Sequence, residues 1–197
     1  MTAQIPDTFR FQGHEWSAIG VSGTGLFEPT RFGIEPVMMS TGCYRGFHCT
    51  YDIEDDGIFL SHVVIQARKN ATYPQIAGDS PAFDNAFGAA EYRKLRLRVE
   101  FDGRVLLGRG FMKDRYVHMG FQKPHAYQHV YECLFSNGRL SHHVDHSHTF
   151  QAVREYLDQE IRETADAEET RRRPSIGLWI LHCFHLDYKL WAVFRDP

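Results

Sequence analysis

The residues best placed to do chemistry are the histidines between positions 127 and 148, which flank an Asn137-Gly138 pair. Asn-Gly is typical of the two-residue turn of a β-hairpin, because both residues tolerate a positive φ. Pairing outward from this turn predicts a ribbon whose one face ends in a cluster of imidazoles. The predicted facing pairs are Phe135 with Leu140, Cys133 with His142, Tyr131 with Val144, His129 with His146, and Tyr127 with His148.

This cluster is a candidate metal site. Opposed residues of an antiparallel pair have Cβ atoms about 4.5–5.5 Å apart and Zn–N bonds are about 2 Å long, so two opposed imidazoles reach one ion. His129, His146 and His148 share the predicted face and are the candidate Zn ligands of a metal-dependent, hydrolase-like enzyme. The alternative is that they are polar side chains at the solvated end of the sheet, since the chain contains 12 histidines.

A basic segment between residues 93 and 115 forms a second candidate surface. Asp102-Gly103 is another turn signal, and pairing residues 95–101 with 104–111 about it predicts Arg96 opposite Arg109, with Arg98 on the same face. Like charges directly opposed in a sheet are destabilising unless an acidic group or a ligand lies between them. This face therefore predicts an anion or nucleic-acid site.

Two aromatic residues extend this prediction, and internal carboxylates offer an alternative to it. Tyr92 and Tyr116 lie near the basic segment and would supply stacking surfaces for single-stranded nucleic acid. The alternative is that a carboxylate of the chain neutralises the arginines. The candidates for that role are Glu91, Glu100, Glu155, Asp158 or another internal carboxylate.

The sequence lacks the common catalytic signatures. It contains no Gly-x-Ser-x-Gly elbow, phosphate loop, His-Glu-x-x-His or dinucleotide fingerprint. The glycine-rich stretch 20–25 has no following lysine, and its composition indicates a flexible loop. We therefore predict a non-catalytic protein-binding or adaptor module that uses the basic hairpin and exposed aromatic loops. No cofactor is expected unless the histidines bind Zn.

Composition indicates one folded domain that spans residues 1–197. Hydrophobic residues make up 43% and charged residues 24%, which is ordinary globular usage. A net charge of -3 gives no general attraction to nucleic acid, so that class of partner is not favoured. Residues 1–9 lack a secretory signal, and charged residues interrupt the apolar stretch 176–194, so a cytoplasmic protein without membrane contact is expected.

The four cysteines are too dispersed for a metal ribbon. They are Cys43, Cys49, Cys133 and Cys183. A chain of this length builds its own core without a disulfide framework. We expect reduced, structural thiols.

Alternating apolar residues between glycine turns predict a mainly β fold, either a curved antiparallel sheet or a barrel-like meander of hairpins. Strands are expected at 9–11 and 16–21, at 37–53 and 58–66, at 95–101 and 104–111, at 116–121, and at 176–194, where the last would close the sheet. A long loop or insertion is expected near 67–92.

One principal helix is expected late in the chain. Phe150, Val153, Leu157 and Ile161 are spaced as one apolar face, which predicts an amphipathic helix near residues 149–170 that packs on the sheet. A charged linker near 163–174 is expected to follow it.

Overall fold

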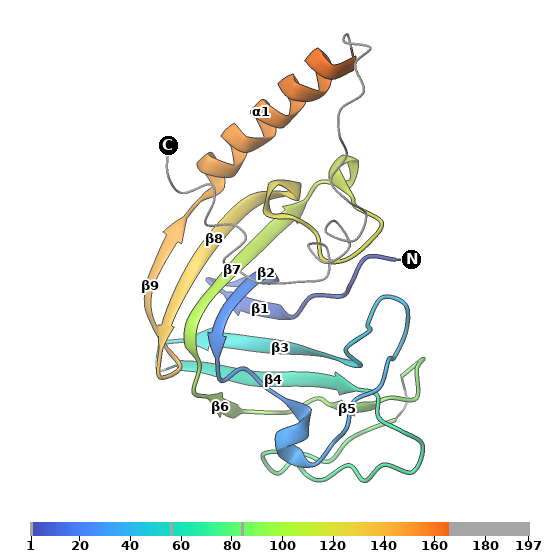
Figure 1. The fold of residues 1–197 in the computed structure, drawn as a ribbon. Helices are drawn as coiled ribbons and strands as arrows, with labels where there is room; N and C mark the ends of the chain where they lie inside the picture. Colours follow the sequence, from blue (N-terminus) through green and yellow to red (C-terminus); the bar gives the residue numbers. More distant parts are fainter. Residues whose placement is uncertain (1, 56, 84, 166–197) are drawn as a thin grey trace.

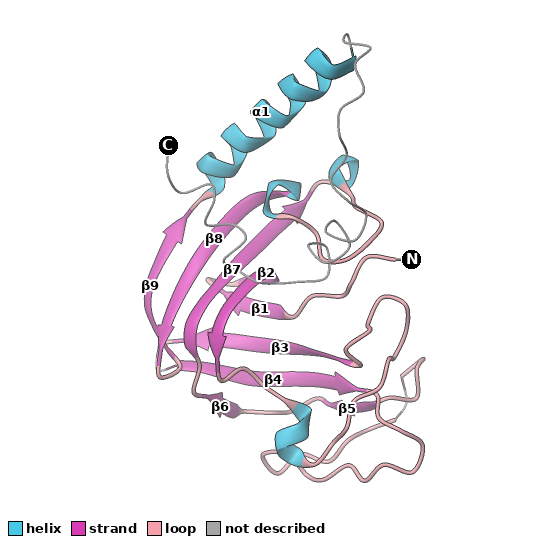
Figure 2. Ribbon diagram, in the orientation of Figure 1, coloured by secondary structure: helices cyan, strands magenta, loops and turns pink. Residues whose placement is uncertain are grey.

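The computed structural model describes residues 2–55, 57–83 and 85–165, and this part of the chain is mostly β (Figures 1 and 2). Its strands are β1 (Thr8–Phe11), β2 (His14–Thr24), β3 (Phe47–Glu54), β4 (Gly57–Ile65), β5 (Ala90–Tyr92), β6 (Leu97–Val99), β7 (Asp102–Phe111), β8 (Tyr127–Ser136) and β9 (Arg139–Asp145). The helix α1 spans Ser147–Ala165, and short 3-10 turns lie at η1 (Pro29–Phe32), η2 (Lys113–Arg115) and η3 (Pro124–Ala126).

The described strands form one mixed, strongly curved sheet, which confirms the predicted β-rich class. The strand order is β5-β4-β3-β1-β2-β7-β8-β9, with β6 beside β4. Only β1 and β3 pair in parallel among the named strands. Figure 1 shows two limbs that run across one another, β3 and β4 in one and β7 to β9 in the other. The sheet does not close into a barrel.

Turn chemistry accounts for two of the hairpins. Gln12 and Gly13 have φ values of 51° and 73°, and Asn137 and Gly138 have 49° and 70°, as a primed two-residue turn requires. The third hairpin joins β3 to β4 at the expected position. The predicted strand pair at 9–11 and 16–21 is confirmed. The pair predicted at 37–53 and 58–66 is also present, but its first strand begins only at Phe47, because residues 37–46 form turns and irregular segments.

The predicted hairpin about Asp102-Gly103 is wrong. β6 pairs with β4, whereas β7 pairs with β2 and β8. A Cβ atom on Gly23 would lie 2.1 Å from the backbone oxygen of Asp102, so the two backbones touch at this point. Residues 99–102 therefore cross from one limb to the other instead of turning back.

The remaining predictions concern the segments 116–121, 67–92 and 176–194. Residues 116–121 form no named strand and make only an isolated bridge between Ala3 and Gly120, so that prediction is wrong. In the region of the predicted long loop or insertion near 67–92, β4 ends at Ile65 and β5 begins at Ala90, with no named strand between them. The strand expected at 176–194 and most of the charged linker lie outside the described residues.

The expected helix is confirmed, and it begins at Ser147. The Asp145 carboxylate accepts a hydrogen bond from the Ser147 backbone N–H at 2.8 Å, which stabilises the first turn. Phe150 and Val153 pack in a small cluster with Ile19, Leu106 and Val130 on the convex side of the sheet. No helix among the described residues is long and apolar enough to span a membrane.

The main core fills the concave side, between the two limbs. It is rich in aromatic side chains, among them Phe9, Trp16, Phe47, Tyr51 and Phe101. Cys49 and Cys133 belong to this core, and together with Cys43 they are buried free thiols, as predicted. Cys183 lies outside the described residues.

Candidate functional site

The register of the β8–β9 hairpin differs from the prediction by one residue. Phe135 pairs with Leu140, but beyond a β-bulge Leu134 pairs with His142 and Cys133 with His143. The extra residue is Ser141, whose hydroxyl donates to the Leu134 carbonyl at 3.1 Å. A one-residue slip exchanges the faces of all later side chains, so the predicted pairs from Cys133–His142 outward are wrong.

The three candidate metal ligands consequently do not form one group among the described residues. His129 is exposed on β8, opposite Arg109, and His148 is exposed in the first turn of α1. His146 Nε2 lies 2.9 Å from Oε2 of Glu132, a carboxylate only 2% exposed that also accepts Arg104 at 3.3 Å. Within the described part of the chain, no group of three His, Cys, Asp or Glu side chains is placed to hold a metal ion. The metal hypothesis gains no support from this geometry.

The predicted basic face is also not assembled. Arg96 forms a bidentate pair with Glu54 at 2.8 and 2.9 Å and stacks on Phe59, with 4.3 Å from guanidinium carbon to ring centroid. Arg98 lies opposite Phe59 in the β4–β6 pair. The predicted opposition of Arg96 and Arg109 is wrong, and the carboxylate that neutralises Arg96 is none of the four named from the sequence.

The two predicted stacking tyrosines have different surroundings. Tyr92 is fully buried, and its hydroxyl donates to the Pro74 carbonyl at 2.6 Å, so its ring is not available to a base. Tyr116 is 41% exposed, and its hydroxyl accepts the Ala3 N–H at 3.3 Å. The nucleic-acid alternative therefore loses one of its two stacking surfaces.

Arg109, like Arg98, forms no ion pair with the residues that the structure describes, but unlike the exposed Arg98 it is half-buried. Its guanidinium carbon lies 5.0 Å from the ring centroid of Trp16. Its Nε is buried and has no hydrogen-bond partner. A half-buried cation without a carboxylate is unusual, because burial of an unpaired charge costs free energy.

Aromatic rings extend from Trp16 on the concave side. Trp16 packs on Tyr131 with ring centroids 4.8 Å apart, and the ring of His143 lies nearly parallel to Tyr131 at 6.2 Å. Trp16 is itself fixed, because its indole N–H donates to the Phe11 carbonyl at 3.1 Å. We call Arg109, Trp16, Tyr131 and His143 the Arg109 surface.

The neighbouring acid does not neutralise this surface. Asp145 lies opposite Tyr131. Burial raises the pKa of Asp145, but hydrogen bonds from Ser147 and Tyr131 outweigh burial and hold that pKa below its usual value. Its carboxylate is therefore held in the ionised form by hydrogen bonds at the start of α1, and among the described residues it makes no ion pair with Arg109.

The chemistry open to this surface is recognition. A guanidinium stacked on an aromatic ring is weakly hydrated and presents a planar fork that matches a carboxylate or phosphate. The nearby thiol of Cys133 is no nucleophile, because burial, followed by the charge of Glu132, raises its pKa to about 12.

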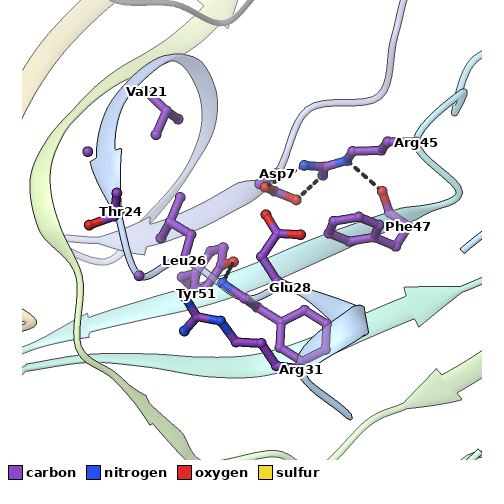
Figure 3. A pocket seen from close by; sticks show the side chains of 12 residues that line it. Asp7, Val21, Thr24, Leu26, Glu28, Arg31, Arg45, Phe47 and Tyr51 are labelled. Carbon is purple, nitrogen blue, oxygen red and sulfur yellow. Dashed lines mark hydrogen bonds and ion pairs between the residues drawn. The ribbon is translucent and has the colours of Figure 1, made fainter. Parts of the chain in front are cut away.

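A second region, at the other end of the concave side, contains a cavity of about 390 Å³ (Figure 3). We call it the Glu28 hollow. Its lining comprises Asp7, Val21, Gly23 to Glu28, Arg31, Arg45, Phe47 and Tyr51. The segment from Thr24 to Arg31, which leaves β2 and enters η1, forms one wall.

Elsewhere in the lining, the buried carboxylate of Asp7 forms an ion pair with the half-buried Arg45. Asp7 is 5% exposed and accepts both terminal nitrogens of Arg45 as well as the Cys49 backbone N–H at 2.6 Å. Arg45 Nε donates to the Phe47 carbonyl at 2.7 Å, and its guanidinium lies 4.5 Å from the Phe47 ring centroid. Burial lowers the pKa of Arg45, but the charge of Asp7 outweighs it and raises that pKa overall.

The Cys49 thiol and the Tyr51 hydroxyl near this pair stay protonated and are therefore poor nucleophiles. Burial raises the pKa of the Cys49 thiol and of the Tyr51 hydroxyl well above their ordinary values. The Tyr51 hydroxyl instead accepts the Phe27 backbone N–H at 3.1 Å and fixes the loop. The hollow is therefore equipped to bind rather than to attack a ligand.

Sequence reasoning missed most of these residues. Trp16 entered only as a strand residue, and Asp7 and Arg45 were not singled out, because their partners lie far away in the chain. Comparison with models of protein families, with curated proteins and with solved structures returns no match for this chain.

Proposed function

We propose that this chain is a non-catalytic, protein-binding module of the cytoplasm, and that Arg109 receives a carboxylate of the partner. The observation that carries the proposal is the guanidinium of Arg109, which has no ion pair within the described part of the chain, lies on Trp16 and has a buried Nε without an acceptor. A carboxylate of the partner would supply both a negative charge and hydrogen-bond acceptors, because carboxylates and guanidinium groups often form bidentate pairs.

The other stacked arginines support this interpretation. Arg45 and Arg96 also lie over aromatic rings, and each has a carboxylate of the chain, Asp7 and Glu54 respectively. The fold therefore neutralises two of these three arginines internally. For the third, a partner in solution would complete the same arrangement.

The openness of the surface favours a protein segment over a small molecule. His143, at the edge of the Arg109 surface, and His129, beside Arg109, are both exposed. Trp16 is only 3% exposed and Tyr131 is half-buried, so a partner would reach this surface through Arg109 and the exposed histidines at its edge. Small ligands usually need a cavity that covers most of their surface, whereas a partner segment can approach such an edge. Arginine is also among the residues that contribute most to protein-binding energies.

The test uses the full chain and a capped peptide that carries one aspartate beside one tryptophan. We expect that addition of the peptide shifts the NMR resonances of the chain most strongly at the Trp16 indole and at Arg109. Replacing the aspartate by asparagine should weaken binding about tenfold or more, because hydrogen bonds between charged groups contribute about 1.5–3 kcal/mol. Benzoate, a free small carboxylate, should bind more weakly than the peptide.

Two variants make the test specific. Arg109→Gln should lose the aspartate preference, while Arg98→Gln, a change at another arginine of the predicted basic segment, should retain it. Circular dichroism checks that both variants fold. Equal binding of the aspartate and asparagine peptides to the unaltered chain would overturn the proposal.

A further inference from the structure

The Glu28 hollow has a neighbour on the other side of the same loop. A second cavity of about 450 Å³ shares the segment from Thr24 to Glu28 and Arg31, and its far wall is formed by Phe32 and residues 97–100. Cavities of this size fall within the range of small-molecule sites, about 300–1,000 Å³. The loop between them therefore determines what either cavity can hold.

This loop is held in one conformation. Gly23 and Gly25 have φ values of 138° and 105°, and a Cβ atom on either would lie 2.1 Å from a backbone oxygen of residues 100–102. Phe27 is buried, with its ring stacked on Phe32 at 5.3 Å. The glycines predicted to make a flexible loop instead permit close backbone contact, so the hollow is preformed.

The hollow contains four charged side chains. Two of them form an ion pair with each other, and the other two have no partner within the described residues. Asp7 and Arg45 neutralise each other. Glu28 and Arg31, both exposed at the rim, make no side-chain hydrogen bond or ion pair within the described residues. Figure 3 shows the Glu28 carboxylate directed toward Asp7 and the Arg31 guanidinium directed toward Leu26.

We propose that the Glu28 hollow binds a small zwitterion of the amino-acid type. The ammonium group would lie against Glu28 and the carboxylate against Arg31, with an apolar side chain on Leu26, Phe27 and Phe47. A simple anion would meet the charge of Glu28, and a simple cation would meet that of Arg31. A zwitterion can pair with Glu28 and with Arg31 at the same time.

The experiment titrates the full chain with L-leucine, N-acetyl-L-leucine and L-leucinamide, followed by ligand-observed NMR. We expect leucine to bind saturably and each derivative to bind about tenfold more weakly, because each lacks one charge. Equal binding of all three, or no saturable binding of leucine, would overturn the proposal.

Variants assign the two ends. Glu28→Gln should weaken leucine binding about tenfold but leave the binding of N-acetyl-L-leucine unchanged. Arg31→Gln should weaken leucine binding about tenfold but leave the binding of L-leucinamide unchanged. Both residues are exposed, so neither change removes a core contact. Glu100→Gln, in the adjoining cavity, is the matched control and should have no effect. Arg109→Gln should not alter leucine binding, so this proposal and the protein-binding proposal fail independently.

Discussion

Arg45 and Arg109 are two arginines in similar surroundings with opposite electrostatic outcomes. Each guanidinium lies over an aromatic ring on the concave side of the sheet, 4.5 Å from Phe47 and 5.0 Å from Trp16 respectively. Arg45 has Asp7 and a backbone carbonyl as acceptors, whereas no acceptor reaches the Nε of Arg109. The difference separates an arginine that holds the fold together from one that is available to a partner.

The ion pair of Arg45 joins distant parts of the chain. Asp7 precedes β1, and its carboxylate also accepts the backbone of Cys49 in β3. β1 and β3 form the parallel pair of the sheet, which no short turn can connect. Arg45 and Asp7 therefore reinforce a junction that local sequence does not specify.

The largest expected effect is that of Asp7→Asn. Removal of one partner from a buried ion pair leaves an uncompensated charge and typically costs about 3–5 kcal/mol. We expect a loss of that size in the free energy of unfolding, measured with urea. The buried thiol of Cys49 should also become reactive toward iodoacetamide. A loss below about 1 kcal/mol would show that Asp7 does not hold this junction.

A smaller effect is expected for Glu54→Gln, which removes the carboxylate of Arg96. The side chains of this pair are 62% and 38% exposed, and surface ion pairs contribute about 0.2–1 kcal/mol. The unfolding free energy should fall within that range, and added salt should reduce the difference. A loss as large as that of Asp7→Asn would mean that burial does not distinguish the two pairs.

The smallest effect on stability is expected for Arg109→Met. The change loses a cation–π contact of about 0.5–2 kcal/mol, but it also removes a half-buried charge without a partner, and the two effects offset each other. The unfolding midpoint in urea should stay close to that of the unaltered chain. A loss of several kcal/mol would assign Arg109 to the structural class of Arg45.

Local features of the fold follow from the sequence. The Gln12-Gly13 and Asn137-Gly138 turns require positive φ values that their residue types favour, and the apolar spacing after Thr149 is that of a helix. Each of these signals depends on residues within one turn or one strand. For that reason the predicted hairpins at 9–21 and 127–145 and the helix are present.

Only the tertiary structure decided which side chains meet. The bulge at Ser141 moves His143, in place of His142, opposite Cys133, and alternation alone does not reveal an inserted residue. The partner of Arg96 is Glu54, 42 positions away, because β6 pairs with β4 instead of β7. Strand and turn identity depend on local backbone energetics, whereas the charges that balance Arg45 and Arg96, and leave Arg109 unbalanced, depend on pairing between distant strands.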